Sequence, residues 1–125
     1  MSDIRNDLKY SKEHEWIRVE GNVGTIGISD FAQHELGEIV YVELPAVGDS
    51  FKANALFGTV ESVKAASDLF IPVSGTVIEL NHGVEDAPDT INSTPYDAWM
   101  IKIEMDDASE LDQLMSADEY KAHTS

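Results

Sequence analysis

The sequence contains no cysteine. This excludes a disulfide scaffold, a thiol nucleophile, iron–sulfur ligation and a zinc site built on cysteine. A reducing compartment is the default expectation for such a chain.

Basic residues are scarce as well. The chain has 24 Asp and Glu against 8 Lys and Arg, which gives a formal net charge of −16. Nucleic acids and anionic membranes are bound by clustered Lys and Arg, so neither is expected as a partner. The acidic surface is instead expected to attract basic patches on partner proteins. Between Val19 and Ile101 only two basic residues occur, Lys52 and Lys64.

Long apolar runs are missing too. No run approaches the roughly 20 residues that a membrane helix needs. The first seven residues carry acids and no apolar segment, which argues against a secretory signal and a transit peptide. A chain of 125 residues is typical of one domain, so we expect a single domain over residues 1–125 with its core at about 8–120. We expect it in the cytoplasm, or in the mitochondrial matrix as a mature form.

Common catalytic and metal-binding motifs are also absent. Gly21, Gly24 and Gly27 have the wrong spacing for a dinucleotide fingerprint. His14 and the glutamate after it lack the second histidine of a zinc helix, and residues 106–112 lack the glycine of a calcium loop. Nothing in these spacings calls for a metal site, so we predict none, and paired surface carboxylates leave glycoside chemistry open.

The apolar and turn residues indicate a mainly β chain. Two strands are expected around a Gly21–Asn22 turn, and Gly24–Ile26 resembles Gly58–Val60, which suggests two β-rich halves packed as a sandwich. The expected strands lie at about 16–28, 39–44, 56–63, 69–71, 75–80 and 99–103.

Two helical regions are expected. A short helix at 31–36 has Ser29 or Asp30 as its cap and Gly37 at its end. From Asp107 the pattern is helical, with possible capping boxes at 109–112 and 116–119. Residues 81–96 are expected to be a loop with room for one helical turn.

Lys64 lies between the strands predicted at 56–63 and 69–71, at or beside a tight reversal. The small residues 65–67 that follow leave its amine uncovered, and Glu61 and Asp68 flank it. One interpretation is a lysine that solvates a hairpin tip. The other is a lysine presented for acylation, which removes its charge and makes a mobile tether on a rigid scaffold.

Six segments decide between these interpretations, because together they resemble the glycine cleavage system H protein family from about Leu8 to Tyr120. They are Tyr10-Ser-Lys-Glu-His-Glu-Trp16, Gly27-Ile-Ser-Asp-Phe-Ala-Gln33, Leu36-Gly-Glu-Ile-Val-Tyr-Val-Glu-Leu-Pro45, Val47-Gly-Asp49, Phe57-Gly-Thr-Val-Glu-Ser-Val-Lys-Ala-Ala-Ser-Asp68 and Pro72-Val-Ser-Gly75.

The resemblance implies a fold and a role. The fold is a barrel-sandwich hybrid of the lipoyl/biotinyl-like kind, with two antiparallel sheets and short helices, including one at the C-terminus. The role is that of a non-catalytic carrier in which Lys64 bears lipoic acid in amide linkage. It shuttles the aminomethyl group of glycine from glycine decarboxylase (P protein) to an aminomethyltransferase (T protein). Dihydrolipoyl dehydrogenase (L protein) then reoxidises the arm, and lipoate-attaching enzymes load it. A monomer is expected.

The resemblance also assigns recognition residues. Glu61 and Gly75 match positions that the lipoate-attaching enzymes favour. A second interpretation of Gly75 is turn geometry with a positive φ.

Four residues are implied as an arm-docking cleft: Glu15, His34, Glu35 and Asp68. A carboxylate there would hold the arm's cationic amine. The alternatives are a solvated strand residue for Glu15, a turn-stabilising one for Asp68 and a surface helix residue for His34. Family members often have histidine where this chain has Glu35.

Two departures from the family pattern keep a rival open. The segment Pro95–Trp99 is shorter than usual and lacks both family glycines, and Thr90 stands where leucine is usual. The rival is a lipoyl-relay homologue that serves other lipoate-dependent enzymes. A biotin carrier usually has methionines beside its lysine, whereas Val63 and Ala65 stand here. An enzyme or an unmodified scaffold would lack the arm.

Overall fold

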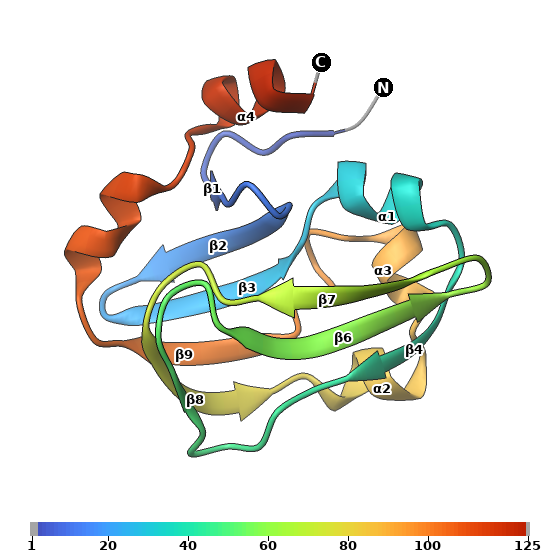
Figure 1. Ribbon diagram of the computed structural model, residues 1–125, viewed down its shortest axis with the longest axis horizontal. Coiled ribbons are helices and arrows are strands. Elements are labelled where there is room, and N and C mark those ends of the chain that lie inside the picture. The colour runs from blue at the N-terminus through green and yellow to red at the C-terminus, as the bar shows by residue number, and fades with distance from the viewer. Residues whose placement is uncertain (1–2, 125) are drawn as a thin grey trace.

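The computed structural model describes residues 3–124 (Figure 1). Met1, Ser2 and Ser125 of the predicted domain therefore lie outside the described residues. The strands are β1 (Lys9–Tyr10), β2 (Glu15–Glu20), β3 (Val23–Ile28), β4 (Ile39–Glu43), β5 (Ser50–Phe51), β6 (Leu56–Ser62), β7 (Ala66–Phe70), β8 (Gly75–Leu80) and β9 (Ile101–Met105). The helices are α1 (Asp30–Leu36), α2 (His82–Asp86), α3 (Thr90–Ser93), the 3-10 helix η1 (Ala108–Gln113) and α4 (Ala117–Thr124).

Two antiparallel sheets form the body of the protein. One has the order β1-β2-β3-β9-β8-β5 and the other the order β4-β6-β7, which crosses in front of it in Figure 1. Between them lies a core of aliphatic side chains, such as Ile26, Val60 and Ile103, which are fully buried. Burial of each such side chain stabilises the folded state by about 1.5–3 kcal/mol relative to its exposure to water. The predicted mainly β, two-sheet fold with a C-terminal helix is confirmed.

The helix ends follow the predicted chemistry. The Ser29 Oγ accepts a hydrogen bond from Ala32 N at 3.2 Å, and Gly37, with φ +82°, closes α1 by donating to Gln33 O at 2.9 Å. Ser116 and Glu119 form a capping box at α4: Ser116 N donates to Glu119 Oε1 at 2.9 Å and Glu119 N donates to Ser116 Oγ at 3.3 Å.

A second, aromatic cluster fastens α4 to the rest of the protein. The rings of Tyr10 and Tyr120 stack with centroids 4.4 Å apart. The Tyr120 hydroxyl is 2.6 Å from Ser29 Oγ and 2.8 Å from His14 Nδ1. Trp16 Nε1 donates to Pro95 O at 3.1 Å, so the shortened 95–99 segment is packed into this cluster. The C-terminal helix is thus tied directly to the N-cap of α1.

Several predicted boundaries were wrong. The loop expected at 81–96 contains α2 and α3, the strand expected at 69–71 begins at Ala66, and β9 begins at Ile101 rather than at position 99. Asp107, not Ser109, caps η1, because the Asp107 Oδ1 accepts from Ser109 N. The two-residue strands β1 and β5 are too short to leave a pattern in the sequence. No helix within residues 3–124 is long and apolar enough to cross a membrane.

Candidate functional site

Lys64 lies at the tip of the β6–β7 hairpin. The last paired residues are Glu61 and Ala66, and Ser62 N donates to Ala65 O at 2.7 Å to close the turn. The Ser62 hydroxyl oxygen accepts hydrogen bonds from Lys64 N at 3.3 Å and Ala65 N at 3.1 Å. No residue of this turn has a positive φ. The serine side chain therefore shapes the turn between Glu61 and Ala66.

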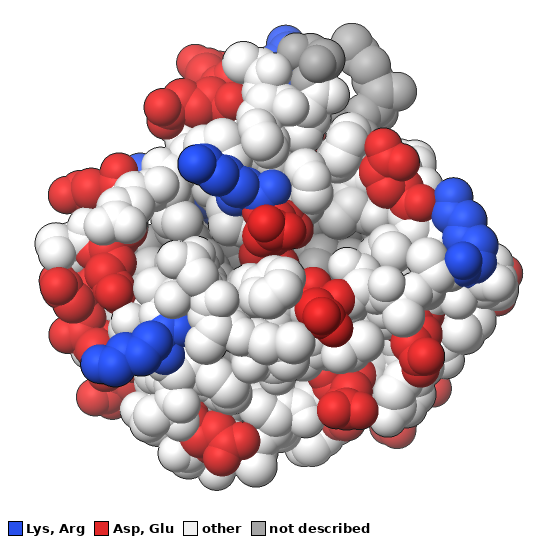
Figure 2. Space-filling model, in the orientation of Figure 1, with Lys and Arg blue, Asp and Glu red and all other residues white. Residues whose placement is uncertain are grey.

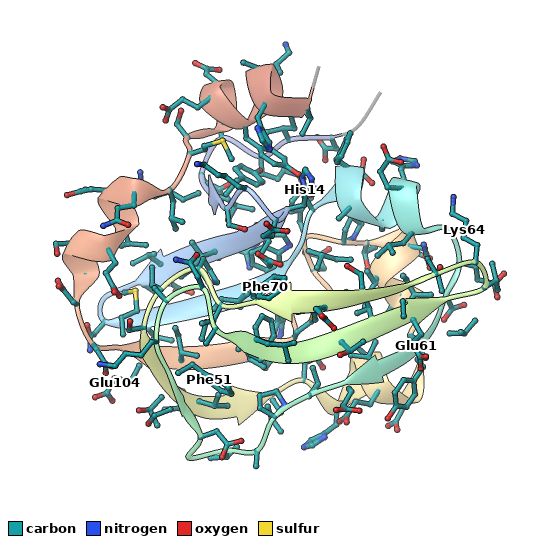
Figure 3. All side chains as sticks on the ribbon, viewed as in Figure 1. His14, Phe51, Glu61, Lys64, Phe70 and Glu104 are labelled. Atoms are coloured by element: carbon teal, nitrogen blue, oxygen red, sulfur yellow. The ribbon has the colours of Figure 1, made fainter. Side chains whose placement is uncertain are left out.

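The hairpin tip is also held from outside. Val63 N donates to Glu38 O at 3.0 Å, in the connection between α1 and β4. A Cβ added at Gly37 would lie 3.5 Å from Lys64 Cε, so the lysine stem rests beside the end of α1. Lys64 is exposed, and it makes no ion pair with any residue of the described range 3–124. Its amine is accessible on a fixed backbone (Figure 3).

The surrounding surface is acidic. On the face shown in Figure 2, acidic side chains are spread over the surface and basic side chains stand singly. Glu61 is exposed at the last pair before the turn, opposite Tyr41 of β4. Position 61 is therefore accessible to a protein that recognises the hairpin.

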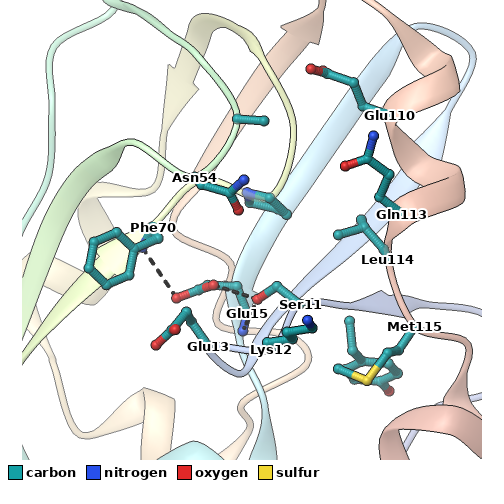
Figure 4. A pocket seen from close by; sticks show the side chains of 13 residues that line it. Ser11, Lys12, Glu13, Glu15, Asn54, Phe70, Glu110, Gln113, Leu114 and Met115 are labelled. Carbon is teal, nitrogen blue, oxygen red and sulfur yellow. Dashed lines mark hydrogen bonds between the residues drawn. The ribbon is translucent and has the colours of Figure 1, made fainter.

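A pocket of about 470 Å³ opens between the β1–β2 connection, the segment at 53–54 and η1 (Figure 4). Glu15 lines it and is 1% exposed. The Glu15 Oε1 accepts from Ser11 Oγ at 2.5 Å, and Oε2 accepts from Phe70 N at 3.3 Å. Burial raises the pKa of Glu15 to about 8, although both hydrogen bonds oppose the rise. The alternative interpretation of Glu15 as a solvated strand residue is therefore wrong.

The raised pKa of Glu15 predicts a pH-dependent stability. Between pH 4.5 and about 8 the folded carboxyl holds its proton while the unfolded one has lost it. The free energy of unfolding should therefore fall as pH rises, by up to about 1.4 kcal/mol per unit from this group. Urea unfolding of the wild type and of Glu15→Gln across this range should show the fall only in the wild type. An equal slope in both proteins would contradict the assignment.

The other predicted cleft residues do not line this pocket. His34 is exposed on α1, with Nε2 3.5 Å from Asp30 Oδ1 one turn earlier. Glu35, also exposed on α1, raises the pKa of His14 by its charge, although burial lowers that pKa more strongly. Asp68 is exposed on β7, two residues before the Phe70 whose amide reaches Glu15.

A glycine is needed at position 75 because the backbone of β9 lies close to it. Gly75 opens β8 between Phe51 of β5 and Met105 of β9. Its φ is not positive, so the turn-geometry interpretation was wrong. A Cβ at Gly75 would lie 2.6 Å from Glu104 O, closer than atoms approach without a shift of the backbone. The glycine lets two strands of the sheet pack at this distance.

Sequence reasoning missed Ser11 and the contribution of η1 to the pocket. Ser11 donates to Glu15 and also accepts from Glu15 N at 3.1 Å, closing a local turn. A serine four residues before a glutamate does not by itself predict such a hydrogen-bonded turn. The spacing could be interpreted only after the turn was seen in the structure. Gln113 and Leu114 reach the pocket from about a hundred residues away along the chain, and no local pattern predicts that.

Comparisons with known proteins show the family of the chain. A sequence model of the family described as glycine cleavage H-protein matches residues 8–125. The chain belongs to the glycine cleavage H-protein family. It is 58% identical over 122 residues to the glycine cleavage system H protein of Halalkalibacterium halodurans, covering 97% of this chain and 95% of that protein. The H protein of Carboxydothermus hydrogenoformans is 57% identical, with 97% and 94% covered.

A solved structure extends the family likeness to the fold. The crystal structure of a glycine cleavage system H protein from Mycobacterium marinum matches with a TM-score of 0.87 and 36% identity, covering 95% of this chain and 97% of that chain. H-protein membership supports the predicted role of lipoyl carrier in glycine cleavage and does not favour the relay alternative.

Proposed function

We propose that Lys64 of this family member carries a lipoyl group and that the protein has no catalytic activity of its own. The observation that carries the proposal is the exposed Lys64 amine at the tip of a hairpin held by Ser62 and by the Val63–Glu38 hydrogen bond. An attachment point needs a rigid backbone and an accessible amine, and this hairpin supplies both. The partners would be the P, T and L proteins and the lipoate-attaching enzymes.

The residues at the hairpin fit a lipoyl-lysine. A bound lipoyl group supplies a disulfide that takes up the carried unit together with two electrons. The chain contributes the amine, a turn that does not depend on the Lys64 side chain, and small exposed neighbours at Ala65 and Ala66 that leave room for an attaching enzyme. Glu61, exposed at the last pair before the turn, is the proposed recognition residue beside them.

The proposed resting place of the arm follows β7 toward the Glu15 pocket. Figure 3 places Lys64 at the hairpin tip and Phe70 near the other end of β7. The five residues of β7 span about 14 Å. Asp68 and Phe70 alternate with the buried Leu69, so their side chains leave the strand on the opposite side from the core. An arm turned back along this side would pass Asp68 and end near Glu15.

Glu15 is suited to receive a cationic amine. Near neutral pH its raised pKa keeps it largely protonated. A cation placed against it would favour the carboxylate and lower that pKa, so we expect binding of an amine-bearing arm to release a proton. The pocket walls would limit access of water to the arm. His34 and Glu35 are proposed only as the outer residues of this docking region. The protein is proposed to act as a cytoplasmic monomer.

Mass spectrometry tests the attachment site. The apo-protein is incubated with lipoate, ATP and a lipoate–protein ligase, and its intact mass is measured. We expect a single lipoyl adduct, which peptide mapping assigns to Lys64. Lys52, the other lysine of the central region, provides the internal control and should stay unmodified. An adduct elsewhere, or none from a ligase that modifies a standard lipoyl domain, would overturn the proposal.

A further inference from the structure

The connection between α1 and β4 touches the lysine hairpin at two points. The Glu38 carbonyl accepts the Val63 N–H at 3.0 Å, and Gly37 lies beside the Lys64 stem. Residues 37 and 38 belong to neither α1 nor β4, and the Gly37 N–H bond to Gln33 O that closes α1 leaves the Gly37 carbonyl free to be held from elsewhere. Whatever fixes this connection also fixes the hairpin tip.

Asn92 of α3 holds the connection from both sides of Glu38. Its Oδ1 accepts the Ile39 N–H at 2.9 Å, and its Nδ2 donates to Gly37 O at 2.8 Å. The same Nδ2 donates to Gln33 Oε1 at 2.9 Å, and this bond links Asn92 to α1. Only a side-chain amide offers an acceptor and donors at this spacing. The neighbouring Ile91 is fully buried, so α3 provides a firm base for these bonds.

We propose that Asn92 is a positioning residue for lipoyl attachment. It does not touch Lys64. It fixes the Gly37–Ile39 connection, which in turn holds Val63 and so sets where the Lys64 amine is presented to the attaching enzyme. This inference rests on the proposed lipoylation of Lys64.

Loss of Asn92 should loosen the hairpin rather than change the amine. Without the side chain, Ile39 N and Gly37 O lose their partners, and the connection no longer has a single preferred position. The hairpin would then spend part of its time away from the conformation that the attaching enzyme binds. A substrate that is only partly in its competent conformation shows a raised KM with little change in kcat.

Two measurements on the whole protein test this positioning role. The first is hydrogen exchange of the Val63 amide, and the second is the kinetics of lipoate transfer by a ligase. For Asn92→Ala we expect Val63 to exchange faster and KM for the apo-protein to rise about tenfold, with kcat within about twofold. Asn92→Asp keeps the acceptor for Ile39 N but places a carboxylate oxygen against Gly37 O, so it should raise KM at least as much. It also decides the test should the alanine variant fail to fold.

Asn81→Ala is the matched control. The Asn81 side chain also joins two backbone groups, donating to Trp99 O at 2.7 Å and accepting from Gly83 N at 3.1 Å, but it does so at the N-cap of α2. Asn81→Ala should leave hydrogen exchange of the Val63 amide and the KM for the apo-protein at wild-type values. Unchanged exchange and KM in the Asn92 variants, or equal changes in Asn81→Ala, would overturn the positioning role. Failure of the wild type to accept lipoate at Lys64 would instead overturn the proposed function.

Discussion

Lys64→Arg is expected to abolish glycine-dependent NADH formation in a mixture of this protein with glycine decarboxylase, the aminomethyltransferase and dihydrolipoyl dehydrogenase. Arginine keeps the positive charge and much of the length of lysine. Its guanidinium stays protonated under all working conditions, so it offers no free amine for an amide bond with lipoate. NADH absorbance, after preincubation with lipoate and a ligase, should fall to the rate seen without carrier.

The stability of the fold should not change in Lys64→Arg. Lys64 is exposed and forms no ion pair within residues 3–124, so Lys64→Arg should unfold at the wild-type urea concentration. Lys52→Arg, at the other exposed lysine of the central region, should keep full activity. Glycine-dependent activity in Lys64→Arg would show that another residue bears the arm, whereas a shared loss in Lys52→Arg would point to a general effect of the substitution.

Local chemistry explains which parts of the fold could be predicted. The caps of α1 and α4 were predictable because a serine, a glutamate and a glycine at fixed spacings satisfy backbone groups within a few residues. β7 was predicted too short because Ala66, Ser67 and Asp68 have little intrinsic preference for strands. They are extended because β6 pairs with them residue by residue. Pairing between strands is set by the fold and leaves no local signal.

The site also divides into a part set by local sequence and a part set by distant segments. The hairpin that presents Lys64 is one continuous segment, so its sequence was enough to place the lysine at a reversal. The pocket is assembled from four separate segments, at 10–15, 53–54, 70–72 and 110–115, and only the fold brings Phe70 N to the Glu15 carboxylate. That is also why Glu15 was open to interpretation as a solvated residue. His34 stands one position before the family's usual histidine, and on α1 its Nε2 lies 3.5 Å from Asp30 Oδ1.

The role of Gly75 can be separated into a structural and a recognition part. A methyl group at this position would lie 2.6 Å from Glu104 O and 2.9 Å from Ile103 Cδ1. The carbonyl belongs to the backbone of β9, so relief requires β8 and β9 to move apart in the middle of the six-stranded sheet. We expect Gly75→Ala to lower the free energy of unfolding by about 3 kcal/mol, measured by urea denaturation.

Gly21→Ala provides the control for a glycine whose Cβ meets nothing. Gly21 has φ +61° and no atom within 4 Å of an added Cβ, so only backbone strain of about 1 kcal/mol is expected. Lipoate transfer to the folded fraction of Gly75→Ala then separates the two roles. A wild-type rate per folded molecule would mean that the attaching enzyme senses this position only through the strand spacing. A variant of wild-type stability that is no longer lipoylated would refute the steric explanation and assign Gly75 to direct recognition.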